Sequence, residues 1–269
     1  MKELTIEEIK SISLEILQDV HDFCVANGIH YSLSSGTLLG AIRHKGFIPW
    51  DDDIDILMPR PDYEQFCKTY HSSKGYRLFC AQNDDYWSAF ARVCEMEKSL
   101  VISKWPMGRV TTGMWIDVMP IDGAEADMMV FEQHAEEAYR RYRDVIERRK
   151  IKKRWMVNDL VCKLSYIKQT ILGNCSVHRA ALKYIDCCKR IPFGSTAYVS
   201  NYSGCATIKP RRHNLNAFQE FELAQFENRE YYIIKGYDHY LRNVYGDDYM
   251  ELPPLEKRYS HSVHKYYWK

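Results

Sequence analysis

One stretch of the chain decides its fold: Trp50-Asp51-Asp52-Asp53-Ile54-Asp55-Ile56-Leu57-Met58. Its apolar half is typical of a packed strand, and in an extended chain alternate side chains point to opposite faces. We therefore expect Asp51, Asp53 and Asp55 to share one face. At roughly 7 Å, two such charges repel by about 2 kcal/mol at an effective dielectric constant of about 20. A half-buried strand tolerates this only with a countercharge, and rows of oxygen ligands favour a hard divalent cation such as Mg²⁺ or Mn²⁺.

Two other interpretations compete with a metal site. The aspartates would simply be solvated if the stretch were a charged turn, but its apolar half favours burial. A calcium loop of the EF-hand type needs a glycine at its sixth position and a bidentate acid at its twelfth. Counted from Asp51, these positions hold Ile56 and Asp62, and Pro59 and Pro61 intervene. The pattern therefore excludes a calcium loop.

Composition limits the class of protein. The chain has 269 residues, 46% of them hydrophobic, which suffices for one large core with a small subdomain. A net charge of +1 gives no overall field that would attract nucleic acid. No apolar run is long enough for a membrane span, and the first residues lack the apolar core of a signal peptide. The nine cysteines are scattered without a Cys-x-x-Cys pair, so we expect reduced thiols in a cytoplasmic protein.

A candidate phosphate-binding turn precedes the acidic stretch. Thr5 and Glu8 form a capping box that starts a helix, Asn27-Gly28 closes it, and residues 29–33 alternate as a short strand. The run Ser34-Ser35-Gly36-Thr37 then leads into an apolar helical turn ending at Arg43. Small residues between a strand and a helix let backbone N–H groups meet a phosphate. A glycine turn at such a place is, however, more often only a turn.

Charged residues interrupt two later apolar segments. Arg92 lies within a strand expected over residues 87–94, where its planar fork suits either a ligand phosphate or an ion pair. Asp117 is the one charged group in an otherwise apolar strand, and burying it alone is costly. Placed beside the acidic strand, Asp117 would complete a cage of three carboxylates for the same metal. Asp122-Gly123, by contrast, is typical of a turn.

The remaining chain predicts further elements. We expect helices over residues 63–70, 176–189 and 237–244, a strand over 76–80, and a loop or hairpin over 108–112. Residues 198–208 predict strand and loop, and residues 226–234 a closing strand or hairpin. Residues 124 to about 172 are helical and basic. Their cations crowd into 140–154: Arg140, Arg141, Arg143, Arg148, Arg149, Lys150, Lys152, Lys153 and Arg154. Such a run is ordinarily a solvated face. The alternative hypothesis is peripheral docking on an anionic membrane, at the inner face of the plasma membrane, or on a pyrophosphate-linked lipid.

Two blocks of the chain resemble the LicD family. The first runs from Ser35 to Asp55 and combines Ser-Gly-Thr-Leu-Leu-Gly-Ala-Ile-Arg with Gly-Phe-Ile-Pro-Trp-Asp-Asp-Asp-Ile-Asp. The second is Tyr245-Gly246-Asp247-Asp248-Tyr249 with Leu252-Pro253-Pro254. The resemblance extends from about Ile29 to Arg258. A departure is Phe226-Glu227-Asn228, where family members commonly have Phe-Glu-Gly.

The family is similar to the nucleotidyltransferase superfamily, and this implies an α/β (α+β) fold. We expect a nucleotidyltransferase-like small mixed sheet flanked by helices, with a mostly helical insertion and C-terminal part. Residues 1–123 would form the catalytic core, 124–192 the basic helical segment, and 193–269 the part that completes the same compact domain.

The resemblance also implies a phosphotransferase. It would move phosphocholine, or a similar alcohol phosphate, from CDP-choline or a similar CDP-alcohol to a hydroxyl of a lipid-linked glycan precursor such as teichoic acid or lipopolysaccharide. Position by position, Asp53, Asp55 and Asp117 match the metal ligands for Mg²⁺ or Mn²⁺, and Asp117 or Asp51 would accept the hydroxyl proton. The candidate substrate-binding residues are Ser35, Gly36, Thr37, Arg43, Trp50 and Arg92. A nucleotidyltransferase that releases pyrophosphate and a non-catalytic glycan-binding relative remain the alternatives.

Overall fold

The computed structural model describes residues 1–82, 86–102, 112–155, 176–204, 210–259 and 264–269, without the side chains of 150–155. Its centre is a seven-stranded mixed sheet in the order β1-β2-β6-β4-β3, with β7 paired to β6 and β8 to β7. The strands are β1 (Ser32–Leu33), β2 (Asp55–Pro59), β3 (Arg77–Phe79), β4 (Ala91–Cys94), β6 (Trp115–Ala124), β7 (Tyr198–Ser200) and β8 (His213–Asn214). Of these pairings only β2 with β6 is parallel. This mixed sheet flanked by helices confirms the predicted fold class.

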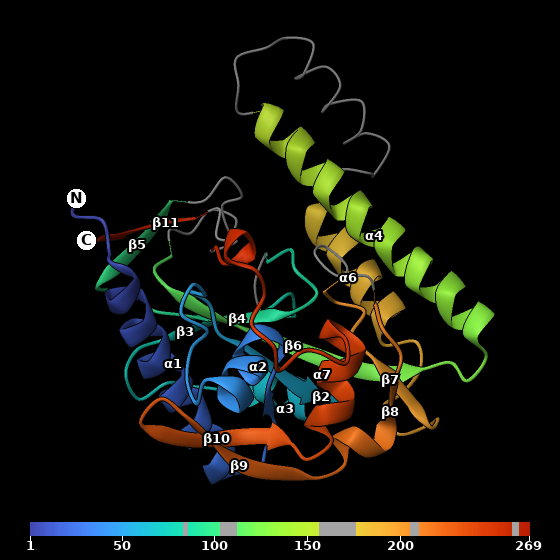
Figure 1. Cartoon of the computed structure of the whole chain (residues 1–269). Helices are drawn as coiled ribbons and strands as arrows, with labels where there is room; N and C mark the ends of the chain where they lie inside the picture. The colour runs from blue at the N-terminus through green and yellow to red at the C-terminus, as the bar shows by residue number, and fades with distance from the viewer. Residues whose placement is uncertain (83–85, 103–111, 156–175, 205–209, 260–263) are drawn as a thin grey trace.

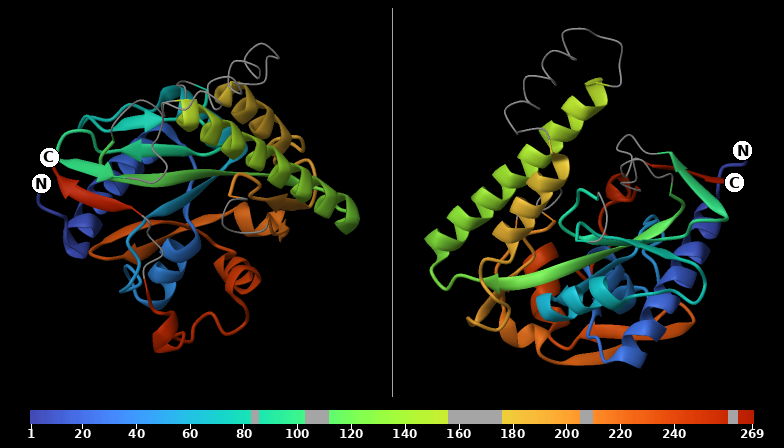
Figure 2. Two further views of the ribbon diagram at one scale, coloured as in Figure 1. Left: turned by 90° about the horizontal axis from the view of Figure 1, so that it is seen from above. Right: turned by 180° about the vertical axis from the view of Figure 1, so that it is seen from behind.

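Helices and one hairpin cover a face of the sheet. The helices are α1 (Ile6–Asn27), α2 (Ser35–Arg43), α3 (Arg60–Thr69) and α7 (Tyr237–Tyr245). The hairpin of β9 (Phe221–Phe226) and β10 (Arg229–Ile234) closes this layer from outside (Figures 1 and 2). The capping box predicted for Thr5 and Glu8 is present, and Gly28 ends α1 with a left-handed φ of 63°. The large core between these layers includes fully buried Ile16, Leu38 and Phe66.

A helix pair packs at one end of the sheet. It consists of α4 (Met128–Trp155) and α6 (Val177–Cys188), which lie side by side (Figures 1 and 2). The pair has a small apolar core of its own, in which Ala138, Val145 and Tyr184 are buried.

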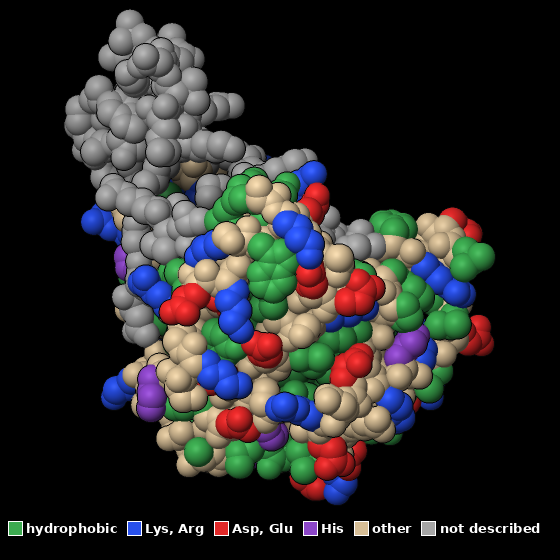
Figure 3. All heavy atoms as spheres, turned by 90° about the vertical axis from the view of Figure 1, so that its left-hand side faces the viewer, with side chains coloured by type: hydrophobic (Ala, Val, Ile, Leu, Met, Phe, Trp, Pro, Cys, Tyr) green, Lys and Arg blue, Asp and Glu red, His purple; other side chains and the backbone are tan. Residues whose placement is uncertain are grey.

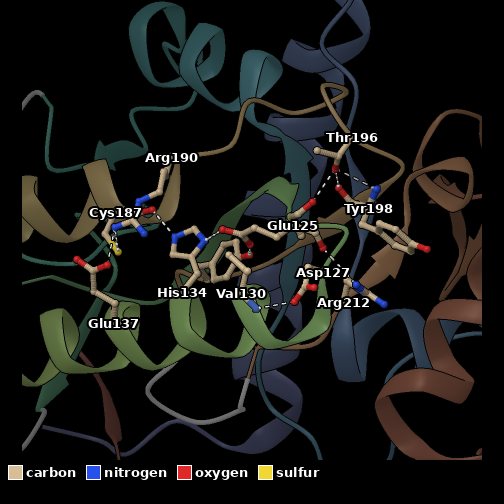
Figure 4. A network of polar contacts seen from close by, with 12 residues as sticks. Glu125, Asp127, Val130, His134, Glu137, Cys187, Arg190, Thr196, Tyr198 and Arg212 are labelled. Carbon is tan, nitrogen blue, oxygen red and sulfur yellow. Dashed lines mark hydrogen bonds and ion pairs between the residues drawn. The ribbon is translucent and has the colours of Figure 1, made fainter.

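Polar contacts join the two helices to each other and α4 to the end of β6 (Figure 4). His134 on α4 lies between the carboxylate of Glu125, 2.8 Å from its Nδ1, and the carbonyl oxygen of Cys187, 2.7 Å from its Nε2. Arg190 donates to Glu137 across 2.6 Å. The position of α4 is therefore set by contacts along its buried face.

A third, small sheet joins the two ends of the described chain. β11 (Lys265–Trp268) pairs antiparallel with β5 (Ser99–Ile102), and Glu3 bridges to Tyr267. Two short 3₁₀ helices, η1 (Leu215–Phe218) and η2 (Leu255–Lys257), complete the secondary structure. On the face seen in Figure 3, basic and acidic side chains are interspersed, which agrees with the near-zero net charge.

Several elements differ from the sequence predictions. The strand expected from Asp51 begins only at Asp55, so residues 51–54 form a loop. The turn expected at Asp122-Gly123 is wrong: Asp122 is fully buried within β6 and accepts two hydrogen bonds from Arg60, at 2.6 and 2.7 Å. Of the closing strand or hairpin expected over 226–234, the structure has the hairpin, which turns at Glu227-Asn228, and its first arm β9 lies mostly before the expected range. The loop or hairpin expected over 108–112 lies outside the described residues except for Thr112.

The described cysteines and helices have these properties. All six described cysteines are free, buried thiols: Cys24, Cys67, Cys80, Cys94, Cys187 and Cys188. Every described helix is too short or too polar to cross a lipid bilayer.

Candidate active site

The parallel pair of strands brings two acids together. In the β2–β6 register Asp55 lies directly opposite Asp117, and the N–H of Asp117 donates to the carbonyl of Ile54 at 2.9 Å. Ile56 and Val118, the next pair along, are fully buried, which anchors this register in the core. Neighbouring strands are about 4.8 Å apart, so the two carboxylates begin from adjacent backbone positions. Asp51 and Asp53 approach from the loop that precedes β2.

The glycine turn is attached to the first residue of β2. The N–H of Ser34 donates to the carbonyl of Asp55, and the N–H of Asp55 donates to Thr37 Oγ1, both at 2.9 Å. Ser35 has a φ of 48°, a left-handed backbone conformation that residues other than glycine rarely adopt. A Cβ on Gly36 would lie 2.5 Å from Asp51 Oδ2, so a larger residue there would force that carboxylate to move away from the turn. The turn and the acids form one unit.

The carboxylates raise one another's pKa. Burial, then the charges of Asp55 and Asp51, hold the pKa of Asp53 well above its ordinary value. Burial, then the charges of Asp117 and Asp51, do the same for Asp55. Asp53 is nevertheless exposed and Asp55 half-buried, so solvent reaches both carboxylates although protein atoms surround them closely. A cluster that is reachable but resists its own ionisation is suited to bind a cation.

One arginine offsets part of this negative charge. Arg92 on β4 donates to Asp117 Oδ1 at 2.6 Å, and both side chains are mostly buried. Among the residues that the structure describes, no three His, Cys, Asp or Glu side chains are already grouped as metal ligands. The chemistry of the donors, all carboxylate oxygens, fits Mg²⁺ or Mn²⁺. With Asp117 engaged by Arg92, the most accessible donors are Asp53 and Asp55.

The other predicted substrate residues have different surroundings. Thr37 is buried and its hydroxyl accepts the Asp55 N–H. Arg43 donates to the carbonyls of Tyr249 and Glu251, both at 2.8 Å, and so holds the C-terminal segment against α2. Trp50 is half-buried, with the guanidinium of Arg258 5.5 Å from its ring centre. The two blocks that resemble the LicD family therefore meet in space through the contact of Arg43 with Tyr249.

Sequence reasoning did not single out two tyrosines on α7. The hydroxyl of Tyr240 lies 3.1 Å from Ser34 Oγ. Burial, then the charges of Tyr240 and of Asp55, Asp51 and Asp53, raise the pKa of Tyr245, so its hydroxyl stays protonated beside the acids. Tyr245 was visible only as the first residue of the C-terminal motif. A separate surface hollow of about 380 Å³ lies between α4 and α6, and none of its lining residues belongs to the carboxylate cluster.

Comparisons with known proteins give matches over this region and beyond it. Residues 28–156 match the family model described as LicD/FKTN/FKRP, nucleotidyltransferase domain. The lipopolysaccharide cholinephosphotransferase LicD of Haemophilus influenzae is 30% identical to the chain, and the match covers 99% of both proteins. Two uncharacterised proteins match shorter parts. That of Rickettsia typhi is 42% identical over 29% of this chain and 26% of its own length. That of Rickettsia prowazekii is 36% identical over 29% of this chain and 34% of its own length.

Proposed function

Because the chain belongs to the LicD/FKTN/FKRP family, we propose that it is a transferase that moves phosphocholine, or a closely similar alcohol phosphate, to a hydroxyl of a surface glycan. The observation that supports this best is the full-length similarity to a lipopolysaccharide cholinephosphotransferase. The proposed donor is a CDP-alcohol, CDP-choline first, and the proposed acceptor is a lipid-linked precursor of the lipopolysaccharide or teichoic acid type.

The reaction is a displacement at phosphorus. The oxygen of the acceptor hydroxyl forms a bond to the phosphorus that carries choline, and the bond from that phosphorus to CMP breaks. The electron pair leaves with CMP, and the hydroxyl proton passes to a carboxylate. Asp51 suits this task better than Asp117, because Asp117 Oδ1 already accepts a hydrogen bond from Arg92 at 2.6 Å.

The acids have a second task in this proposal. Mg²⁺ or Mn²⁺ held by Asp53, Asp55 and Asp117 would offset the charge of the pyrophosphate and of the departing CMP. Ser35 and Gly36, at the first turn of α2, lie where backbone N–H groups are free of helical partners, a common way to hold phosphate oxygens. The protonated hydroxyl of Tyr245, which lies within electrostatic range of the acids, would supply a further donor.

Product analysis tests the proposal. The purified protein is incubated with CDP-choline, CDP-ethanolamine, CDP-glycerol or CDP-ribitol and a glycan acceptor, with Mg²⁺ or with EDTA. We expect CMP release that requires both the acceptor and the metal. Release of pyrophosphate from CTP instead would indicate nucleotidyl transfer. Equal CMP release by the wild type and by Asp53→Asn would exclude the proposed site.

Contact with a membrane through residues 140–154 is a further part of the proposal. Within the described residues, Arg141 pairs with Glu137 at 3.2 Å and Arg148 with Asp144 at 2.9 Å. Arg140 and Arg143 are exposed and have no ion pair there, so these two are the side chains that we propose face anionic lipid. The side chains of Lys150, Lys152, Lys153 and Arg154 lie outside the described residues.

A further inference from the structure

One arginine of the basic helix points into the protein. Arg149 lies four residues after Val145, which is 1% exposed, and so on the buried face of α4. Its guanidinium carbon is 3.7 Å from the ring centre of Trp87. Trp87 packs against both the large core and the core of the helix pair. Arg149 therefore lies where α4 meets the catalytic domain and differs from its exposed neighbours on the helix.

A second arginine lies close to this point. Arg92, which donates to Asp117, has its guanidinium carbon 4.4 Å from the ring centre of Trp115. Burial, and in addition the charge of Arg92, lower the pKa of Arg149 to about 10. The two guanidinium groups repel each other although Arg92 is paired with Asp117, and a further anion beside them would reduce this repulsion.

Two buried donors lie beside the arginines. The Tyr86 hydroxyl and the Trp87 indole N–H have no hydrogen-bond partner among the described residues, and Tyr86 is only 2% exposed. Burial raises the pKa of Tyr86, and the charges of Arg92 and Asp117 also act on it, so its hydroxyl lies within electrostatic range of the carboxylate cluster. Buried donors without a partner cost stability, and the ones that persist commonly serve a ligand.

We propose that Arg149, Arg92, Tyr86 and Trp87 form an oxyanion subsite that binds a phosphate group of the substrates next to the carboxylate cluster. The inference deepens the proposed function and rests on it. Arginine forks bind phosphate oxygens in pairs, and the hydroxyl and indole N–H add single donors. The helix pair then takes part in substrate recognition through Arg149. The phosphate is either part of the donor pyrophosphate or carried by the glycan acceptor.

Binding without metal tests the subsite directly. Titration calorimetry in EDTA measures the affinity of the protein for inorganic pyrophosphate and for CDP-choline. We expect Arg149→Gln to weaken pyrophosphate binding about ten- to a hundredfold, because a charge-assisted pair of hydrogen bonds is lost. The pyrophosphate affinity of Arg149→Lys should lie between those of the wild type and Arg149→Gln, since lysine keeps the charge and loses the planar fork of the guanidinium. Arg179→Gln, an exposed change on the neighbouring helix α6, is the matched control and should bind as the wild type does.

A subtler variant separates binding from packing. Tyr86→Phe removes only a hydroxyl that has no partner in the described structure, so its melting temperature should equal that of the wild type or exceed it. Its pyrophosphate affinity should nevertheless fall about tenfold. A purely structural Tyr86 would leave the affinity unchanged. This variant also keeps the test decisive if Arg149→Gln does not fold.

Kinetics identify the source of the phosphate. If the subsite holds the donor, Arg149→Gln raises the KM for CDP-choline and its Kd in parallel. If it holds a phosphate of the acceptor, only the KM for the acceptor rises. The proposal is overturned if folded Arg149→Gln and Tyr86→Phe both keep wild-type affinities and KM values. Wild-type CMP release is scored separately, so this result leaves the proposed function standing.

Discussion

Removing one carboxylate from the cluster should make the metal-free protein more stable and inactive. In Asp55→Asn the amide keeps the shape of the side chain and loses its charge. Across the roughly 5 Å between neighbouring strands, two carboxylates repel by about 3 kcal/mol at an effective dielectric constant of about 20. The raised pKa of Asp55 lets the wild type keep a proton for part of the time, so we expect a gain of about 2 kcal/mol.

The sign of this gain follows from proton binding. The folded protein holds the Asp55 proton more tightly than the unfolded chain does, because burial and the charge of Asp117 raise its pKa. The free energy of unfolding without metal therefore falls as the pH rises above the ordinary carboxyl pKa. At neutral pH the wild type is less stable for this reason. The amide of Asp55→Asn does not titrate, so this variant does not lose stability in that pH range.

Thermal melting in EDTA and in Mg²⁺ measures both effects. A gain of about 2 kcal/mol corresponds to a melting temperature about 4 °C higher in EDTA for a chain of this size. Mg²⁺ should stabilise the wild type, since it binds only the folded state, and should stabilise Asp55→Asn much less. CMP release should fall at least about a hundredfold.

The exposed change Asp22→Asn on α1 is the matched control, and we expect it to alter stability by less than about 0.5 kcal/mol. The reasoning is refuted if Asp55→Asn melts below the wild type in EDTA. It is refuted equally if Mg²⁺ raises the melting temperature of both proteins by the same amount.

Three further predictions concern stability and membrane contact. Arg60→Met leaves Asp122 buried without its partner and should cost about 3 to 5 kcal/mol in urea unfolding, and a cost under about 1 kcal/mol would contradict this. Burial lowers the pKa of His213 to about 3, so the unfolded chain binds the extra proton below about pH 6.5. From pH 7.5 to 5 this residue should cost about 2 kcal/mol, a loss that urea unfolding of His213→Gln should lack. The double change Arg140→Gln and Arg143→Gln should weaken sedimentation with anionic vesicles about tenfold or more and leave neutral vesicles unaffected, and unchanged sedimentation would end the membrane hypothesis.

The sequence predicted that Asp117 lies beside the acidic strand, and the register of β2 with β6 confirms this placement. Asp53 and Asp55 belong to a dense local pattern, and Asp117 is a lone charge in an apolar strand. Both features can be recognised in the sequence without knowledge of the fold. Asp122 carried a misleading local signal, since Asp-Gly is turn-like. In the structure Asp122 forms a buried ion pair with Arg60, a partner so distant in the chain that no local pattern identifies it.

Long-range packing explains the other differences. In the basic run, Arg149 looks like its neighbours, and only the packing of α4 against Trp87 distinguishes it. β9 contains Glu222 and Gln225 and is largely exposed, so its pattern lacks the apolar alternation of a strand. β11 exists because it pairs with β5, a partner that no local pattern identifies.

The parallel pairing of β2 with β6 also has a consequence for folding kinetics. Asp55 and Asp117 lie about sixty positions apart in the chain, so their meeting closes a long loop and belongs among the slow, non-local steps of folding. If the acids gather only after the rate-limiting barrier, a bound cation acts on the native state alone. Mg²⁺ should then slow the unfolding limb of a chevron plot and leave the refolding limb where it was.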